Sequence, residues 1–242
     1  MAGNVQDPVA VKAPELSPDE LKQLSDGFED SSPQEILGWA LERFQPDIAL
    51  ACSFQAEESV LVDMLSSLRA DAKIFYLDTE LLFSETYQTR DKFVERYGVQ
   101  PIRLAAPLSV EGQARLYGDE LWKRDANQCC NIRKVLPLTM ALTPLRAWIT
   151  GIRREQAPTR ANAGLVEWDS KFGLVKVSPL AKWTNEDVWK YIADNDVPYN
   201  PLHDQGYPSI GCTHCTRRVA PGEDPRAGRW SGSDKIECGL HQ

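Results

Sequence analysis

The chain lacks the features that would assign it to a membrane, a secretory route or a nucleic acid. No apolar run approaches the length needed to span a bilayer, and the first eight residues show no secretion signal. A basic surplus is also missing, because the formal net charge is −8 over 242 residues, which argues against general nucleic-acid binding. We therefore expect a cytoplasmic protein with no membrane and no nucleic-acid partner, although a local arginine cluster can still bind a small anion.

Cysteine is sparse, but the spacing of the cysteines indicates what they do. Without a secretion signal, six cysteines indicate a reducing compartment, where metal binding or catalysis outranks disulfides. Their positions are a lone Cys52, the adjacent Cys129 and Cys130, the Cys212-x-x-Cys215 pair, and Cys238 close to the end of the chain. Cys52 lies in a short apolar run and is expected in the core, so the other five need a chemical explanation.

Short apolar runs alternate with helical patterns through the first two thirds of the chain. The runs at residues 48–52, 73–77, 101–104 and 147–150 are typical of buried strands. Helical patterns cover 56–68 and 83–97, capping boxes begin helices at Ser17 and Ser32, and a hairpin is expected over 166–177. Strands alternating with helices predict an α/β fold with a parallel sheet flanked by helices, whose ligands bind at the carboxyl ends of the strands.

Two of these strand ends carry candidate nucleotide-binding residues. Residues 53–59 follow the first strand and open a helix, where free backbone amides attract an anion. This loop has neither the glycines nor the lysine of a Walker A motif, so an ordinary strand-to-helix turn is the alternative. Residues 77–79 end the second strand, where a nucleotide could be held; a helix cap is the alternative there.

The two cysteine pairs form a candidate metal site. Four thiolates can hold a structural zinc ion, but side chains of adjacent cysteines diverge and suit one small ion poorly. A cubane cluster offers four separate iron corners, which favours iron–sulfur and leaves zinc as the alternative. Arg133 and Lys134 follow the Cys129-Cys130 pair by one helical turn and share its faces. A solvated basic stripe is the plain interpretation of these two cations.

The last residues, Glu237 to His241, carry a cysteine and a histidine three positions apart. Chain ends are usually mobile, and a thiolate there can act as a nucleophile; a stray surface thiol is the alternative. Arginines are also frequent in the last third of the chain. One guanidinium group can donate two parallel hydrogen bonds to the oxygens of a phosphate or sulfate group.

Together these motifs resemble the assimilatory adenylyl-sulfate (APS) reductases, close relatives of the phosphoadenylyl-sulfate (PAPS) reductases. The resemblance runs from Ser53 to the end, about four-fifths of the chain. The matching residues are the loop at 53–59, Leu77-Asp78-Thr79, Cys129-Cys130 with Lys134, Gly151-x-Arg-Arg, Trp183 to Trp189, Cys212-x-x-Cys215, Arg226-x-x-Arg229-Trp230 and Glu237 to His241. Within the family, the four paired cysteines distinguish the cluster-bearing, APS-preferring branch.

The resemblance implies a fold and a set of site residues. The fold is a Rossmann-like sheet of the adenine nucleotide alpha hydrolase type over residues 17–228, with a flexible arm at 1–16 and a mobile catalytic tail at 229–242. Cys129, Cys130, Cys212 and Cys215 would hold a [4Fe–4S] cluster that does not itself pass electrons. The substrate would be bound by Ser53, Phe54, Leu77, Asp78, Thr79 and Gly151, and its phosphosulfate group by Lys134, Arg160, Arg226, Arg229 and His241. Gln55 and Glu80 stand where members of the family often have glycine.

The implied reaction belongs to assimilatory sulfate reduction. Cys238 attacks the sulfur of APS, AMP leaves, and a thioredoxin or glutaredoxin-like dithiol releases sulfite from the resulting S-sulfocysteine. With four thiols assigned to a metal site and one to the core, Cys238 is the thiol left to react. A PAPS reductase and a zinc-stapled nucleotide-binding sulfur-transfer protein are the alternatives, and the sequence leaves a homo-oligomer open.

Overall fold

The computed structural model describes residues 16–231, 235, 237, 239 and 240. Within them, six strands form one sheet in the order β3-β2-β1-β4-β6-β5. The strands are β1 (Ile48–Ala51), β2 (Ile74–Asp78), β3 (Ile102–Ala105), β4 (Ala147–Ile149), β5 (Val166–Asp169) and β6 (Leu174–Val177). All neighbours pair in parallel except β5 and β6, which form the predicted antiparallel hairpin.

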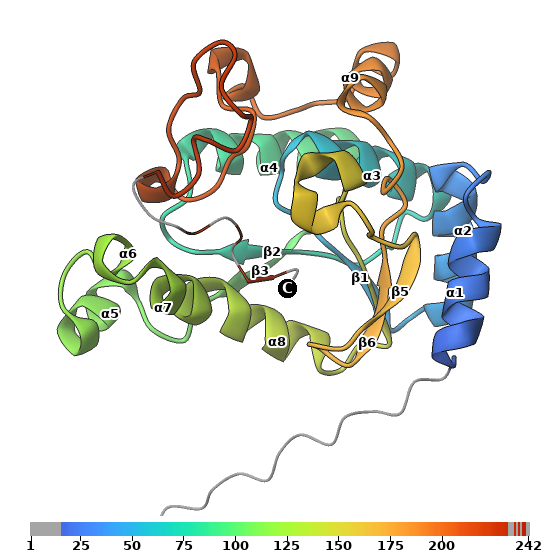
Figure 1. The fold of residues 1–242 in the computed structure, drawn as a ribbon, viewed down its shortest axis with the longest axis horizontal. Helices are drawn as coiled ribbons and strands as arrows, with labels where there is room; N and C mark the ends of the chain where they lie inside the picture. Colours follow the sequence, from blue (N-terminus) through green and yellow to red (C-terminus); the bar gives the residue numbers. More distant parts are fainter. Residues whose placement is uncertain (1–15, 232–234, 236, 238, 241–242) are drawn as a thin grey trace, which may run out of the picture.

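Helices cover both faces of this sheet (Figure 1). They are α1 (Pro18–Gly27), α2 (Pro33–Phe44), α3 (Ala56–Leu68), α4 (Ser84–Tyr97), α5 (Val110–Tyr117), α6 (Leu121–Arg124), α7 (Ala126–Cys130), α8 (Leu136–Leu142) and α9 (Asn185–Asp194). Successive strand residues face opposite sides: Leu50 packs in the cluster with α2 and α3, whereas Ala49 packs with Leu138 and Leu142 of α8. Helices α3 and α8 therefore lie on opposite faces.

The predicted α/β fold class is confirmed, and local chemistry explains most of its boundaries. Ser17 and Ser32 each accept a hydrogen bond from the backbone N–H of the glutamate three residues later, so both predicted capping boxes begin helices. The predicted strands agree with β1 to β4 to within one or two residues at either end. The predicted flexible arm at 1–16 and catalytic tail at 229–242 stay predictions, because residues 1–15 and half of the tail lie outside those described.

The segment between α7 and α8 is not a regular α-helix. Residues Asn131–Val135 form a π-helix between them. Pro137 follows at the start of α8 and has no N–H to donate to the preceding turn. The wider turn places Arg133 inside the protein, with its side chain 1% exposed. The plain interpretation of Arg133 as part of a solvated basic stripe is therefore wrong.

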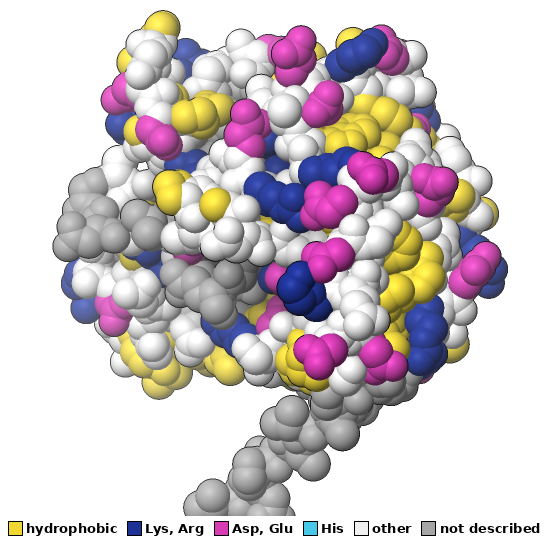
Figure 2. All heavy atoms as spheres, turned by 45° about the vertical axis from the view of Figure 1, so that its right-hand side comes forward, with side chains coloured by type: hydrophobic (Ala, Val, Ile, Leu, Met, Phe, Trp, Pro, Cys, Tyr) yellow, Lys and Arg dark blue, Asp and Glu magenta, His cyan; other side chains and the backbone are white. Residues whose placement is uncertain are grey.

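No helix among the described residues is long and apolar enough to cross a membrane. Charges of both signs are interspersed on the face seen in Figure 2. Several arginines instead line one cavity of the protein: Arg153, Arg160, Arg226 and Arg229.

Candidate functional site

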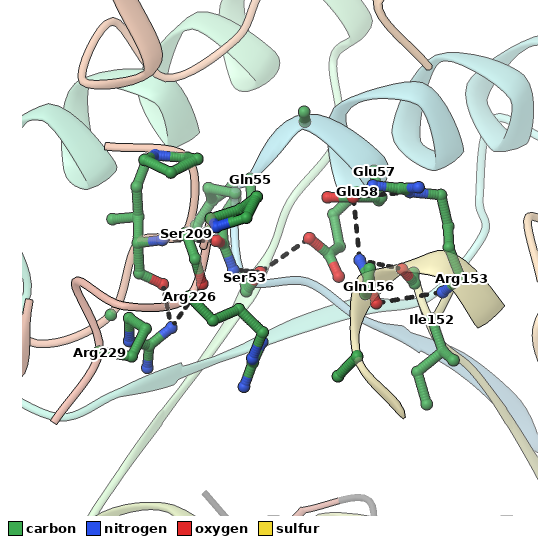
Figure 3. A pocket seen from close by; sticks show the side chains of 18 of the residues that line it. Ser53, Gln55, Glu57, Glu58, Ile152, Arg153, Gln156, Ser209, Arg226 and Arg229 are labelled. Atoms are coloured by element: carbon green, nitrogen blue, oxygen red, sulfur yellow. Dashed lines mark hydrogen bonds and ion pairs between the residues drawn. The ribbon is translucent and has the colours of Figure 1, made fainter. Parts of the chain in front are cut away.

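A cavity of about 930 Å³ opens at the carboxyl ends of the central strands. It is lined by Ser53 beyond β1, Thr79 beyond β2 and Gly151 beyond β4, and Figure 3 shows the part of the lining around Ser53. Strand β1 has β2 on one side and β4 on the other. The order of the strands therefore reverses direction at β1, which creates a crevice between the loops that follow β1 and β4. Such a crevice is where open α/β sheets bind their ligands, and its volume suits a nucleotide-sized molecule.

The fold brings most of the predicted substrate-binding residues to this cavity. They are Ser53, Phe54, Leu77, Thr79, Lys134, Gly151, Arg160, Arg226 and Arg229. The predicted His241 and the predicted nucleophile Cys238 lie outside the described residues. The substrate contacts of all these residues stay predictions.

Asp78 does not line the cavity. Its buried carboxylate accepts hydrogen bonds from Arg103 Nε at 2.5 Å, Tyr87 Oη at 2.7 Å and the Glu80 backbone at 2.8 Å. Burial alone would raise the pKa of Asp78, but these hydrogen bonds outweigh it and hold the pKa below its ordinary value. The role that the structure supports for Asp78 is to fix the turn after β2.

One end of the cavity is acidic. The carboxylate of Glu58 accepts a hydrogen bond from Ser53 Oγ at 2.7 Å. Burial, and then the neighbouring charge of Glu57, raise the pKa of Glu58 to about 7. Glu57 is paired with Arg153 Nε at 2.9 Å and also accepts from Gln156.

Gly151 is needed for this acidic arrangement. A Cβ atom at residue 151 would lie 2.5 Å from Glu58 Oε1 and 2.9 Å from Glu57 Cβ. Any side chain here would push against the two glutamates, so glycine permits the loop after β4 to approach α3 closely. The sequence pointed to Gly151 but not to the glutamates that it accommodates.

The loop after β1 is held by its side chains. Phe54 has a φ of 58°, and its ring packs in the core against Tyr76 with the ring centroids 5.2 Å apart. Gln55 accepts a hydrogen bond from the Ile210 N–H at 2.7 Å and donates to Ser53 Oγ at 3.0 Å. Gln55 is therefore a bridge between the loop after β1 and the loop at residue 210.

The other end of the cavity is basic. Arg229 donates from Nη1 to Ser209 Oγ at 3.0 Å and to the Ile210 carbonyl at 3.1 Å (Figure 3). Its buried Nε has no hydrogen-bond partner among the described residues. A Cβ atom on Gly211 would lie 2.4 Å from Arg229 Nη2, so this glycine makes room for the guanidinium group.

Glu237 belongs to the tail motif but was assigned no role from the sequence, and it lies at this basic end. Its carboxylate accepts hydrogen bonds from Arg160 Nε and Nη2, both at 3.0 Å, and from Arg226 Nη2 at 3.1 Å. The glutamate side chain is 3% exposed. Its position next to Cys238 was the one signal in the sequence that pointed to a role for Glu237. The sequence does not show that Arg160 and Arg226 bind its side-chain carboxylate.

The four paired cysteines line a second, small cavity of about 10 Å³. Cys212 Sγ lies 3.3 Å from Thr79 Oγ1, and Cys129 Sγ accepts a hydrogen bond from Gln113 Nε2 at 3.7 Å. Burial and then the neighbouring thiols Cys212 and Cys130 raise the pKa of Cys215 to about 11. Among the described residues, no three His, Cys, Asp or Glu side chains are arranged to hold a metal ion.

Lys134 and Trp230 line both cavities, so the cysteine cavity directly adjoins the basic end of the large one. His214 stacks on Trp122 with the ring centroids 4.3 Å apart.

An open α/β sheet with a nucleotide-sized cavity at its strand ends places the chain among the nucleotide-binding Rossmann-like proteins. The FMN adenylyltransferase of Candida glabrata shares this fold, with a TM-score of 0.54 at 14% identity over 95% of this chain and 79% of that one. The chain belongs to the phosphoadenosine phosphosulfate reductase family, whose domain model matches residues 47–218.

Named relatives lie within this family. The adenosine 5′-phosphosulfate reductase of Shouchella clausii is 52% identical over 86% of both chains, and that of Staphylococcus epidermidis is 48% identical over 91% of both. Among solved structures, the phosphoadenylyl-sulfate reductase of Candida auris has a TM-score of 0.73 at 31% identity, covering 84% of this chain and 98% of that one.

Proposed function

We propose that this protein reduces adenylyl sulfate to sulfite and AMP in sulfate assimilation, with a dithiol protein as the electron donor. The relatives that are about half identical to it bear the name of this activity. One structural observation carries the proposal for this chain: Glu237 and Leu240, on either side of Cys238, both line the cavity that contains the arginines. The predicted nucleophile is therefore flanked in the sequence by two residues of the cavity wall.

The chemistry is a two-step sulfonyl transfer. The Cys238 thiolate attacks the sulfur of adenylyl sulfate, a sulfur–sulfur bond forms, and the bond from sulfur to the phosphate oxygen breaks, with its electron pair leaving on AMP. One thiolate of the donor then attacks Cys238 Sγ, and sulfite leaves with the electrons of the sulfur–sulfur bond. The second donor thiol resolves the mixed disulfide, so the donor ends oxidised and Cys238 is restored.

Arg229 and Lys134 supply the electrostatics of the first step. Negative charge develops on the phosphate oxygen as its bond to sulfur breaks, and pre-positioned cations stabilise it. Arg229 is the best placed, because Ser209 and Ile210 orient it and its Nε has no partner among the residues the structure describes. Lys134 lies between this site and the cysteines.

The proposal includes a [4Fe–4S] cluster held by Cys129, Cys130, Cys212 and Cys215. These residues fit the group in two respects: they are four thiols, and they line one cavity beside Lys134. When bound, the cluster would supply a fixed charged group beside the substrate site. Zinc is the alternative, and the colour of the purified protein with iron and labile-sulfide analysis distinguishes the two, since a zinc protein is colourless.

The donor is expected to be thioredoxin or a glutaredoxin-like dithiol in the cytoplasm. The functional test is sulfite release from adenylyl sulfate with such a donor. Wild-type protein is expected to turn over, and Cys238→Ser to retain iron and AMP binding with no turnover. A Cys238→Ser protein that still produces sulfite would contradict the mechanism.

A second candidate is PAPS reduction, favoured by the likeness to the Candida auris enzyme. Competition between the two nucleotides in one steady-state assay decides between them. We expect adenylyl sulfate to be preferred, because the relatives with the higher identity are named for it.

A further inference from the structure

Glu237 makes an unusually well-enclosed ion pair for a residue so close to the end of the chain. Its side chain is 3% exposed, that of Arg160 12% and that of Arg226 20%. Arg160 meets it with two parallel hydrogen bonds, the geometry that gives arginine–carboxylate pairs their strength. We call these three residues the tail anchor.

The chain around Cys238 is attached at other points as well. Lys171 Nζ donates a hydrogen bond to the Gly239 carbonyl, and Leu240 packs against the apolar cluster that contains Leu138. Lys235 donates to Asn127 Oδ1 at 2.5 Å. The strongest of these contacts by charge and burial is the tail anchor, and it involves the residue immediately before the proposed nucleophile.

The tail anchor and a substrate can be present together. The cavity measures about 930 Å³ with Glu237 already forming part of its wall, which is ample for a nucleotide. All three guanidinium nitrogens of Arg160 donate to protein oxygens, two to Glu237 and the third to Gln156. Arg160 therefore serves the tail, whereas Arg229 and Lys134 are placed to serve an anion.

We propose that Glu237 is a positioning residue: its carboxylate, held by Arg160 and Arg226, fixes the residue before Cys238 against the cavity wall and so favours attack of the nucleophile on the sulfur of the substrate. This inference rests on the proposed function for its catalytic consequence. The anchoring itself is a property of the nucleotide-free protein and can be tested without any substrate.

The first test measures how readily iodoacetamide alkylates Cys238 in the nucleotide-free enzyme, followed by mass spectrometry of the terminal peptide. Glu237→Gln keeps the shape but removes the charge, and Glu237→Ala removes both. Each variant loses the charged hydrogen bonds between residue 237 and the two arginines, which weakens the attachment of the tail. We therefore expect alkylation of Cys238 to be at least about fivefold faster in both variants.

Glu29→Gln is the matched control. Glu29 forms the same two-bond pair with Arg154, with Nη1 to Oε2 at 3.1 Å, but neither residue lines the cavity. Its alkylation rate should equal that of the wild type. Equal rates in all four proteins would overturn the anchor.

The second test separates positioning from binding. In a single turnover without donor, we expect S-sulfocysteine to form at least about tenfold more slowly in Glu237→Gln, while the Kd for AMP changes by less than about threefold. If AMP binds about tenfold more tightly and the adduct forms at the wild-type rate, Glu237 is a competitor of the substrate and the proposal is wrong. If the wild type forms no adduct at all, the proposed function fails, and the alkylation result still judges the anchor.

Discussion

At the scale of single residues, the protonation of Glu58 makes the stability of the protein depend on pH. Its pKa is raised to about 7 in the folded protein, whereas an unfolded glutamate titrates near 4.5. A raised pKa stabilises the fold below the unfolded value, and this contribution is lost as the pH rises through the folded value. We predict that the free energy of unfolding of the wild type, relative to Glu58→Gln, falls by about 1 to 3 kcal/mol between pH 5 and pH 8. Urea unfolding at both pH values measures this, and a difference that does not vary with pH would contradict it.

A second prediction concerns the stability of a variant at Gly151. Gly151→Ala places a methyl group against Glu57 and Glu58, and we expect a loss of about 1 to 3 kcal/mol in unfolding free energy from overpacking. Gly38→Ala is the control, because nothing lies within 4 Å of its Cβ position and alanine favours the helix. A Gly151→Ala protein as stable as Gly38→Ala would show that the glutamates move aside freely.

At the scale of elements, the π-helix Asn131–Val135 joins the cysteine cavity to the turn after β2. Buried Arg133 donates to the Thr79 carbonyl at 2.9 Å and pairs with Glu80 Oε2 at 3.3 Å. Glu80 has a φ of 58°, a conformation that favours glycine. Its contacts with Arg133 and Arg103 offset that preference in this chain.

We predict that Arg133→Gln lowers the unfolding free energy by about 2 to 4 kcal/mol, because it breaks a buried charged network. The exposed Arg115→Gln should change it by less than about 0.5 kcal/mol. Denaturant unfolding of both variants provides the comparison. Equal stabilities would mean that the π-helix does not depend on Arg133.

The elements themselves were largely predictable from sequence, and the π-helix was not. Apolar runs and Ser-x-x-Glu caps act locally, so the strands β1 to β4 and the helices beginning at Pro18 and Pro33 followed from pattern alone. The π-helix contains Arg133, whose partner Thr79 lies on a turn more than fifty residues earlier, and no local pattern shows that contact. Glu237 was missed for the same reason, because its partners Arg160 and Arg226 meet it only after folding.

At the scale of the whole molecule, the four paired cysteines join segments that are about eighty residues apart in sequence. We predict that Cys212→Ser loses most of its iron and colour. Cys52→Ser should retain both, because Cys52 is a buried core residue that does not line the cysteine cavity. Iron and labile-sulfide analysis of the two proteins measures this. Full iron content in Cys212→Ser would remove that residue from the ligand set.

In the proposed reaction, the sulfur of adenylyl sulfate is transferred to Cys238. The most direct measurement is the mass of the protein after one equivalent of adenylyl sulfate is added without a donor, followed by peptide mapping. We expect a single added sulfonate group on the peptide that contains Cys238, released as sulfite when a dithiol is added. AMP release with no adduct, or an adduct on any other cysteine, would contradict it.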